Sequence, residues 1–224
     1  MKLATQTVVS SLVTFVVFVA LVFLPAGTFD YWQGWLFIAI LVVASAGPAI
    51  HLGVKNPAAL ERRMRGGPLA ESRTPQKIAS SGTLMSLPAA IVISALDHRF
   101  GWSSVPEEIS LIGDVLVVIG VGISFLVIIQ NSYAAANITV EADQKVVSTG
   151  LYRLVRHPMY VGMLIFLAGT PLALGSYRGL VVLILGVIVF AVRILDEEKM
   201  LREELDGYID YTGEVQYRLV PHVW

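Results

Sequence analysis

Six long apolar runs, which few charged residues interrupt, constrain the fold of this chain more than any other feature of its sequence. The hydrocarbon core of a bilayer is about 30 Å thick, so a helix needs roughly 20 apolar residues to cross it. We therefore expect an all-α fold, a polytopic integral membrane helical bundle with about six transmembrane spans. The predicted spans cover residues 8–24, 32–54, 78–96, 109–140, 159–174 and 179–192.

The last two runs are joined by a short turn and are predicted to form a helical hairpin. The polar tail of the fourth run, residues 131–137, is suited to leaving the bilayer. Only 14 residues separate Arg178 from Arg193. A helix of that length spans about 21 Å, so one arginine must extend to the interface or enter a polar cavity. We expect the cavity for Arg193.

The composition supports a membrane protein and excludes several other classes. Hydrophobic residues make up 55% of the chain and charged residues 15%, whereas charged residues are about a quarter of an ordinary soluble domain. The 16 basic and 17 acidic residues give no cationic surface for nucleic acid. The absence of cysteine excludes disulfides, thiolate ligands and a cysteine nucleophile. His51, His98 and His222 are scattered away from carboxylate clusters, so we expect no metal site.

The distribution of lysine and arginine predicts the orientation in the membrane. With six spans, 14 of the 16 basic residues fall on the side that holds both termini. Cytoplasmic loops carry an excess of these residues, so we expect both termini and all candidate chemical groups on the cytosolic side. The expected partners are the lipid bilayer and a small acceptor molecule, with no nucleic acid and no metal.

The two parts of the chain are predicted to play different roles. Residues 1–108 carry few reactive groups and are interpreted as a transmembrane scaffold of three spans with a basic cytosolic loop. Residues 109–224 carry nearly all of these groups and are interpreted as the catalytic region. The loop, residues 55–77, is interpreted as a linker at the membrane surface, with a lipid-headgroup site as the alternative. The C-terminal tail is predicted to be amphipathic and cytosolic, either lying on the bilayer or closing over the site.

Two charged clusters adjoin the ends of the last two runs that the hairpin brings together. Arg156, His157 and Pro158 precede the fifth run, and Glu197 and Glu198 follow the sixth. Ionisable residues at a membrane boundary are functional candidates, and a helix that begins at Pro158 offers N–H groups and a positive dipole end to an anion. Together the clusters could hold a polar zwitterion. In the alternative interpretation the cations are interfacial anchors and the glutamates form ion pairs along an exposed helix.

Two stretches of this region resemble a known family. They read EADQKVVSTGLYRLVRHPMYVGMLIFLAGTPLALGSY over residues 141–177 and RILDEEKMLREELDGYIDYTGEVQYRLVPHVW over residues 193–224. The RHPMY element, the paired glutamates and the tyrosine-rich tail are together similar to the isoprenylcysteine carboxyl methyltransferase family, and more distantly to the phospholipid N-methyltransferases. The resemblance implies S-adenosylmethionine as methyl donor and S-adenosylhomocysteine as product, bound between the last two spans and the tail.

The resemblance also implies the residues of the site. Neighbouring side chains on a helix diverge by about 100°, so we expect Glu198 to point into the pocket and Glu197 to be held by Arg193. The expected catalytic residues are Arg156, Arg193 and Glu198. The expected cofactor-binding residues are Lys145, Val146, Tyr152, Arg156, His157, Pro158, Tyr160, Gly162, Glu197, Glu198, Tyr208 and Tyr211.

The fourth run departs from the family pattern in one respect. Gln130 and Asn131 occupy the region where the resemblance implies an arginine, a difference that concerns recognition of the acceptor more than binding of the cofactor. Gly120 and Gly122 are similar to a GxG element of the phospholipid methyltransferases. Small residues are also frequent where membrane helices pack closely, and we favour packing for both glycines.

The expected function is in-line transfer of a methyl group to a carboxylate or thiol of a lipophilic acceptor such as isoprenylcysteine. These acceptors need no strong base, whereas an amine needs a proton acceptor that neither glutamate obviously provides. Two alternatives stay open, an NADPH-dependent membrane reductase related to the sterol reductases and a non-enzymatic lipid-binding membrane protein. The short chain argues against the reductase.

Overall fold

The computed structural model describes residues 2–57, 60, 73–133, 140 and 144–224. Every regular element in this part of the chain is helical, which confirms the predicted all-α fold. A short helix, α8 (Tyr208–Glu214), follows the last long helix, and two 3₁₀ turns, η2 (Gly150–Arg153) and η3 (Arg178–Leu180), lie in the second half. The long helices are α1 (Lys2–Ala26), α2 (Trp32–Lys55), α4 (Thr74–Phe100), α5 (Glu107–Gln130), α6 (Pro158–Ala173) and α7 (Val181–Glu204).

Five of these helices, α1, α2, α4, α5 and α7, are long and apolar enough to cross a membrane. The remaining predicted span corresponds to α6, an apolar helix of 16 residues. Its length is about 24 Å, which is shorter than a typical hydrocarbon core. The described part of the chain thus has five helices of full spanning length and one shorter apolar helix. This count agrees with the expected architecture of about six spans.

The two helix ends that differ most from the predicted spans are the C-terminal ends of α5 and α7. α5 ends at Gln130 instead of continuing toward residue 140. The Asn131 backbone N–H donates to the carbonyl of Val127 at 2.8 Å, and its side-chain oxygen accepts from the backbone N–H of Tyr133 at 3.0 Å, a local turn that competes with helix. α7 continues to Glu204, well beyond the apolar run; in this extension the carboxylates of Glu197 and Glu198 are satisfied by Tyr160 and Arg156, while the charged side chains of the last turn are exposed.

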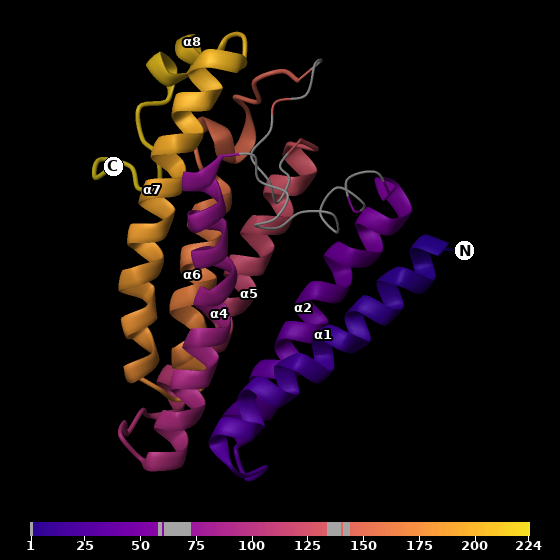
Figure 1. Ribbon diagram of the computed structural model, residues 1–224, viewed down its shortest axis with the longest axis vertical. Coiled ribbons are helices and arrows are strands. Elements are labelled where there is room, and N and C mark those ends of the chain that lie inside the picture. Colours follow the sequence, from indigo (N-terminus) through magenta and orange to yellow (C-terminus); the bar gives the residue numbers. More distant parts are fainter. Residues whose placement is uncertain (1, 58–59, 61–72, 134–139, 141–143) are drawn as a thin grey trace.

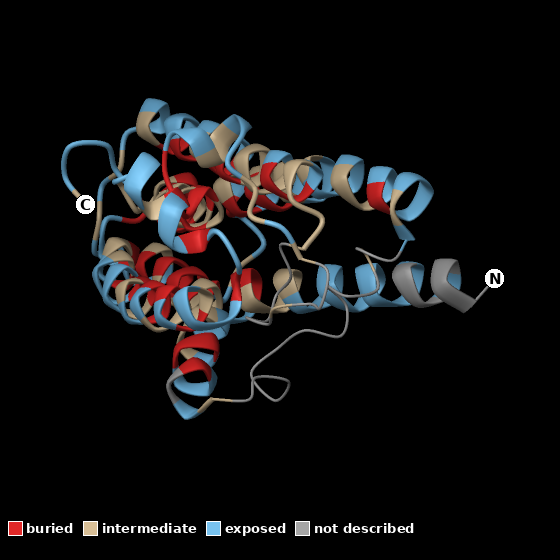
Figure 2. Cartoon of the chain, turned by 90° about the horizontal axis from the view of Figure 1, so that it is seen from above, coloured by how far each residue is buried: buried red, intermediate tan, exposed pale blue. Residues whose placement is uncertain are grey.

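Helices α4 to α7 lie side by side in one bundle, and the hairpin of α1 and α2 leans away from it (Figure 1). Buried residues gather where the helices meet, while the outer faces are exposed (Figure 2). Large apolar side chains such as Leu12 and Val43 are exposed on the hairpin, which suits contact with lipid chains. Where the hairpin joins the bundle, five elements share one core cluster, which includes Val22, Phe37, Ile91, Val117 and Leu174.

α5 and α6 approach closely because glycines line their contact. A Cβ atom on Gly120 would lie 2.6 Å from the backbone nitrogen of Phe166, and one on Gly162 would lie 2.8 Å from Ser124 Oγ. Close backbone approach of this kind is typical of membrane helices. The packing interpretation is therefore confirmed for Gly120. It is wrong for Gly122, which has no neighbouring atom within 4 Å of its Cβ position among the described residues.

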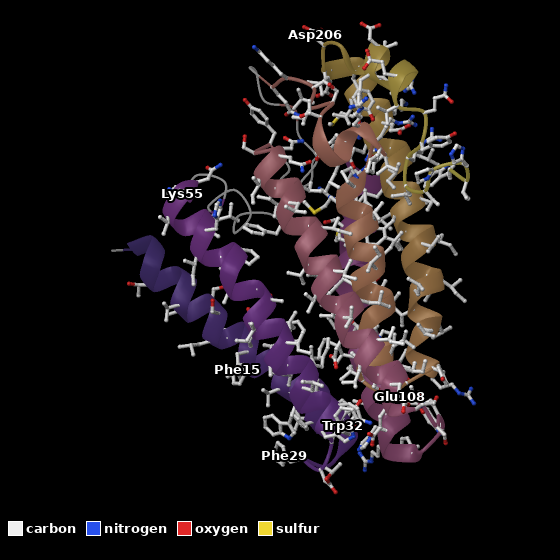
Figure 3. The ribbon with its side chains drawn as sticks, turned by 180° about the vertical axis from the view of Figure 1, so that it is seen from behind. Phe15, Phe29, Trp32, Lys55, Glu108 and Asp206 are labelled. Carbon is white, nitrogen blue, oxygen red and sulfur yellow. The ribbon has the colours of Figure 1, made fainter. Side chains whose placement is uncertain are left out.

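Polar side chains collect at the two ends of the molecule. Lys55 and Asp206 lie at one end, and Trp32 and Glu108 lie at the other (Figure 3). We call the end with Lys55 and Asp206 the α8 end, and the end with Trp32 and Glu108 the opposite end. α6 begins at the α8 end and α7 returns to it (Figure 1), so the hairpin brings both charged clusters of the sequence to the same end.

Candidate active site

The turn that precedes α6 fixes the first charged cluster. A proline occupies the first helical position of α6, where its missing N–H is not required. Arg156 and His157, just before it, are 6% and 5% exposed. Their backbone N–H groups donate to the carbonyls of Tyr217 at 2.9 Å and Arg218 at 3.0 Å. The C-terminal strap, residues 215–224, therefore runs beside this turn.

The strap also receives the Arg156 side chain. Nη1 of Arg156 donates to the backbone carbonyls of Val215 and Gln216, each at 2.8 Å. Nε of the same guanidinium donates to Oε1 of Glu198 at 2.8 Å. A buried guanidinium needs both a counter-charge and acceptors for its N–H groups, and Arg156 obtains the first from α7 and the second from the strap.

Glu198 is the centre of the cluster, with a side chain only 4% exposed. Besides Arg156, it contacts His157, whose Nε2 lies 3.2 Å from Oε1, and Arg218, whose Nε donates to Oε2 at 3.0 Å. Both carboxylate oxygens are thus engaged by cationic or N–H groups, in charge-assisted hydrogen bonds of the strong kind. The structure brings together the two charged clusters, which are 42 residues apart in the sequence.

A second chain of polar contacts begins one residue earlier, at Glu197. The Tyr160 hydroxyl donates to Oε2 of Glu197 at 2.7 Å, and Nε of Arg193 donates to the Tyr160 oxygen at 2.9 Å. Arg193 is 5% exposed, in agreement with the predicted polar cavity. The expected connection between Arg193 and Glu197 is present, with the Tyr160 hydroxyl as its bridge. Glu197 is partly exposed, whereas Glu198 is buried.

Three tyrosines form an aromatic wall beside these clusters. Tyr208 and Tyr211 of α8 are buried and pack with Val146 and Tyr152. The Tyr211 hydroxyl donates to the Tyr152 carbonyl at 2.7 Å, and Nδ2 of Asn131 donates to the Tyr152 hydroxyl at 3.1 Å. Tyr208 differs, because its hydroxyl is buried without a hydrogen-bond partner among the described residues.

The surroundings keep these phenols protonated. Burial raises the pKa of Tyr152 to about 12. Burial, and after it the negative charge of Glu198, raises the pKa of Tyr208 well above the usual range. Burial likewise raises the pKa of Tyr211. At neutral pH the hydroxyls therefore act as hydrogen-bond donors.

The start of α4 is tied to α7 next to the site, a connection that the sequence patterns did not indicate. Arg73 donates to the backbone carbonyl of Asp196 at 2.8 Å and also pairs with its carboxylate. Nε2 of Gln76 donates to the carbonyl of Arg193 at 3.3 Å and to the Asp196 side chain. We call these three side chains, Arg73, Gln76 and Asp196, the α4–α7 lock. No local signal pointed to it, because Arg73 belongs to the loop interpreted as a linker.

Other residues proposed from the sequence lie around this region or serve packing. Lys145 is exposed, and Val146 is partly buried against the tyrosines. Gly162 faces α5, as described above. Gln130 accepts the backbone N–H of Leu151 at 2.9 Å through its side-chain oxygen and so fixes the turn that carries Tyr152. Within the described residues, no three His, Asp or Glu side chains gather closely enough to hold a metal ion.

Comparisons with known proteins identify relatives of this chain. A model of the phospholipid methyltransferase family matches residues 109–206. Two proteins of Oryza sativa, from subspecies indica and japonica, are named probable protein-S-isoprenylcysteine O-methyltransferase. Each is 30% identical over 188 residues, which cover 82% of this chain and 93% of the rice protein.

A solved structure shares the fold. It is that of the eukaryotic intramembrane Ras methyltransferase ICMT (isoprenylcysteine carboxyl methyltransferase), with a TM-score of 0.54 and 17% identity, and the match covers 96% of this chain and 86% of that one. The fold and the relatives define an integral membrane methyltransferase. More narrowly, the chain belongs to the isoprenylcysteine carboxyl methyltransferase family. Methyltransferases of this family generally use S-adenosylmethionine.

Proposed function

We propose that S-adenosylmethionine binds at the α8 end, between α6, α7 and α8, and that its methyl group passes to a carboxylate or thiol of a lipophilic acceptor such as isoprenylcysteine. The observation that carries this proposal is the cluster of three buried side chains, Arg156, His157 and Glu198, with the partly buried Arg218, at the end of a membrane bundle. Buried ionisable groups at such a boundary mark functional sites. The names of the rice relatives support the choice of acceptor.

The chemistry of the donor matches the groups available at this end. S-adenosylmethionine carries an ammonium and a ribose diol, which need acceptors, and a carboxylate, which needs donors. Glu197 is partly exposed and offers an acceptor, while the buried Tyr208 hydroxyl offers a donor that has no partner in the described protein. The positive end of α6 with Arg156 suits the carboxylate, and Tyr211 belongs to the apolar wall suited to the adenine.

Within this proposal the two neighbouring glutamates take different roles. Glu198 already accepts from Arg156 and Arg218 and contacts His157, so we assign it as a positioning residue that holds these cations. Glu197 is the glutamate assigned to contact the cofactor. This assignment reverses the expectation that Glu198 points into the pocket, and it follows from the exposure of the two side chains.

The contacts of Glu197 and Glu198 favour O- or S-methylation over N-methylation. When bound, the donor supplies an electrophilic methyl group on its sulfonium. An acceptor carboxylate or thiolate attacks without a base, whereas an ammonium group must first lose a proton to one. Glu198 is engaged by two arginines, and Glu197 is assigned to the cofactor, so neither is free to serve as that base. The residues of the site therefore act by orienting the reactants, an effect that contributes about 7 to 11 kcal/mol in well-aligned reactions.

A methyl-transfer assay with labelled donor tests the proposal. Purified protein is offered a prenylcysteine, small thiols and a lipid extract, and we expect base-labile methyl ester on the prenylcysteine or thioether on a thiol. Isothermal titration with S-adenosylhomocysteine and with NADPH is run in parallel. Binding of S-adenosylhomocysteine alone supports the methyltransferase, whereas binding of NADPH alone would contradict it.

A further inference from the structure

A pocket of about 390 Å³ lies between α4 and α7, apart from the methyl-transfer site. It is lined by Ile93 of α4, Trp102 of the following loop, Arg178 of η3 and Val181 of α7. α7 begins at the end of the molecule away from α8 (Figure 1), so the pocket belongs to the opposite end of the bundle. Its volume falls within the range of about 300–1,000 Å³ that is usual for small-molecule sites. Three of the four lining residues are exposed, so the pocket opens toward the surroundings of the bundle.

Two walls of the pocket are fixed by one buried carboxylate. Asp97, near the end of α4, is 1% exposed. Its Oδ2 accepts from Ser103 Oγ at 2.6 Å and from Ser176 Oγ at 2.5 Å. The backbone N–H of Arg178 donates to the same oxygen at 3.4 Å. Since Ser103 follows Trp102 in the chain, the segments that carry Trp102 and Arg178 are both held on Asp97.

The Arg178 side chain is the group of this turn that is available to a ligand. The backbone N–H groups of Gly179, Leu180 and Val181 donate to oxygen atoms of the turn itself. In contrast, the guanidinium of Arg178 is exposed and has no hydrogen-bond or ion-pair partner among the residues that the structure describes. A guanidinium presents a planar fork of N–H donors that matches the oxygens of a phosphate.

The pocket extends from the headgroup level of a bilayer into its apolar interior. Trp102 and Phe100 are 51% and 58% exposed, and aromatic side chains of this kind gather at membrane interfaces. Ile93 lies seven residues before Phe100 on α4, about 10 Å deeper along the helix. A cation thus lines the pocket near the interface and an aliphatic side chain lines it at greater depth. This arrangement suits an amphiphile with a negative headgroup better than a soluble anion.

We propose that this pocket binds one anionic phospholipid, with its phosphate on Arg178 and an acyl chain against Ile93 and Val181. The net negative charge neutralises the unpaired guanidinium, whereas a zwitterionic lipid has no net charge with which to do so. The lipid lies in the leaflet away from the methyl-transfer site. It joins α4 to α7 at the opposite end, as the α4–α7 lock does at the α8 end.

Native mass spectrometry of the purified full chain in detergent tests the site. The protein is titrated with phosphatidylglycerol and, in parallel, with phosphatidylcholine of the same acyl chains. Basic residues at the α8 end attract phosphatidylglycerol as well, so the measured quantity is the change caused by each variant. We expect Arg178→Gln to remove one tightly bound phosphatidylglycerol, with a loss of affinity of about tenfold at that site, and to leave phosphatidylcholine binding unchanged.

Arg99→Gln is the matched control. Arg99 is also exposed at this end of α4, but its guanidinium lies 5.6 Å from the centre of the Phe100 ring and does not line the pocket. This variant should bind as many phosphatidylglycerol molecules as the wild type. Ile93→Trp fills the apolar part of the pocket without changing any charge, and it should lose the same lipid as Arg178→Gln.

Two results would overturn the site. In the first, Arg178→Gln binds phosphatidylglycerol with the number and affinity of the Arg99→Gln control, as expected for an arginine that only meets bulk headgroups. In the second, inorganic phosphate displaces the lipid at millimolar concentration, which would show that the pocket recognises a free anion. Arg178 is an exposed side chain, so its replacement leaves the folded core intact. These outcomes are independent of methyl transfer, which is assayed separately.

Discussion

At the scale of single residues, Glu198 is the charge on which the cluster depends. Replacement by glutamine keeps the shape but leaves the buried Arg156 without its counter-charge. Loss of one partner of a buried pair costs about 3 to 5 kcal/mol, so we expect Glu198→Gln to lower the unfolding temperature and to weaken binding of S-adenosylhomocysteine. Glu204→Gln, exposed on the same helix, serves as the control and should change neither.

A double-mutant cycle separates positioning from direct contact. If Glu198 acts through Arg156, then Arg156→Ala combined with Glu198→Gln should weaken S-adenosylhomocysteine binding hardly more than either change alone. Additive losses in binding free energy would instead indicate that each side chain contacts the ligand independently.

Tyr208 and Tyr211 provide a matched pair of phenols with opposite expectations. The Tyr208 hydroxyl is buried without a partner in the described protein, whereas the Tyr211 hydroxyl donates to the Tyr152 carbonyl. Tyr208→Phe should therefore leave the unfolding temperature unchanged or higher, and should weaken S-adenosylhomocysteine binding by about 1 kcal/mol, roughly fivefold. Tyr211→Phe should lower the unfolding temperature. Unchanged affinity in Tyr208→Phe would exclude this hydroxyl as a ligand contact.

At the scale of elements, the contact of α5 with α6 determines where the α6 turn is held. A methyl group on Gly120 would meet the backbone of α6, whereas one on Gly122 meets nothing described. We expect Gly120→Ala to destabilise the protein by about 1 to 3 kcal/mol and Gly122→Ala to be neutral or stabilising. Thermal unfolding of the two variants side by side measures the difference, and equal effects would contradict the close packing.

The C-terminal strap is the second element that holds the site. The backbone carbonyl of Trp224 accepts the N–H groups of Arg218, Leu219 and Val220, and the Arg218 guanidinium lies 5.2 Å from the centre of the Trp224 ring. We expect Trp224→Ala to loosen Arg218 from Glu198 and to raise the Kd for S-adenosylhomocysteine.

Val223→Ala is the control for the strap, because this side chain is 79% exposed. Its affinity for S-adenosylhomocysteine should equal that of the wild type. A Trp224→Ala variant with wild-type affinity would show that the site does not depend on this end of the strap.

The sequence predicted these elements well where one local signal was enough. The lengths of the apolar runs predicted the positions of the helices, and the predicted hairpin of the last two runs implied that Arg156 and Glu198 meet. The Tyr160 bridge and the carbonyls of Val215 and Gln216 could not be predicted, because each depends on how separate segments pack. The sequence patterns did not indicate that Asp114 is buried. It lies just before the longest uncharged stretch of its run, where a charged residue is expected at the edge of a span.

At the scale of the whole molecule, the scaffold and the catalytic region share one bundle. α4 belongs to the predicted scaffold, yet Arg73 and Gln76 bind the backbone of α7 at Asp196 and Arg193. The α4–α7 lock thus holds the helix that carries both glutamates. We propose the division at residue 108 as one of function, with the chemical groups in residues 109–224, and not as a boundary between independently folding parts.

The orientation of the bundle in the membrane is a property of the whole molecule that can be tested directly. The excess of lysine and arginine at the α8 end favours a cytosolic site, where soluble cofactors are present. The chain has no cysteine, so a single cysteine introduced at an exposed position reports its own side of the membrane. Asp206 lies at the α8 end and Glu108 at the opposite end (Figure 3).

In intact cells, a membrane-impermeant maleimide should label Glu108→Cys directly and Asp206→Cys only after the membrane is permeabilised. Both positions are exposed and outside the site contacts, so retained methyl transfer in each variant verifies the fold. The reverse labelling pattern would place the site outside the cytosol. In that case the basic residues would no longer explain the orientation, and the supply of S-adenosylmethionine to the site would need another route.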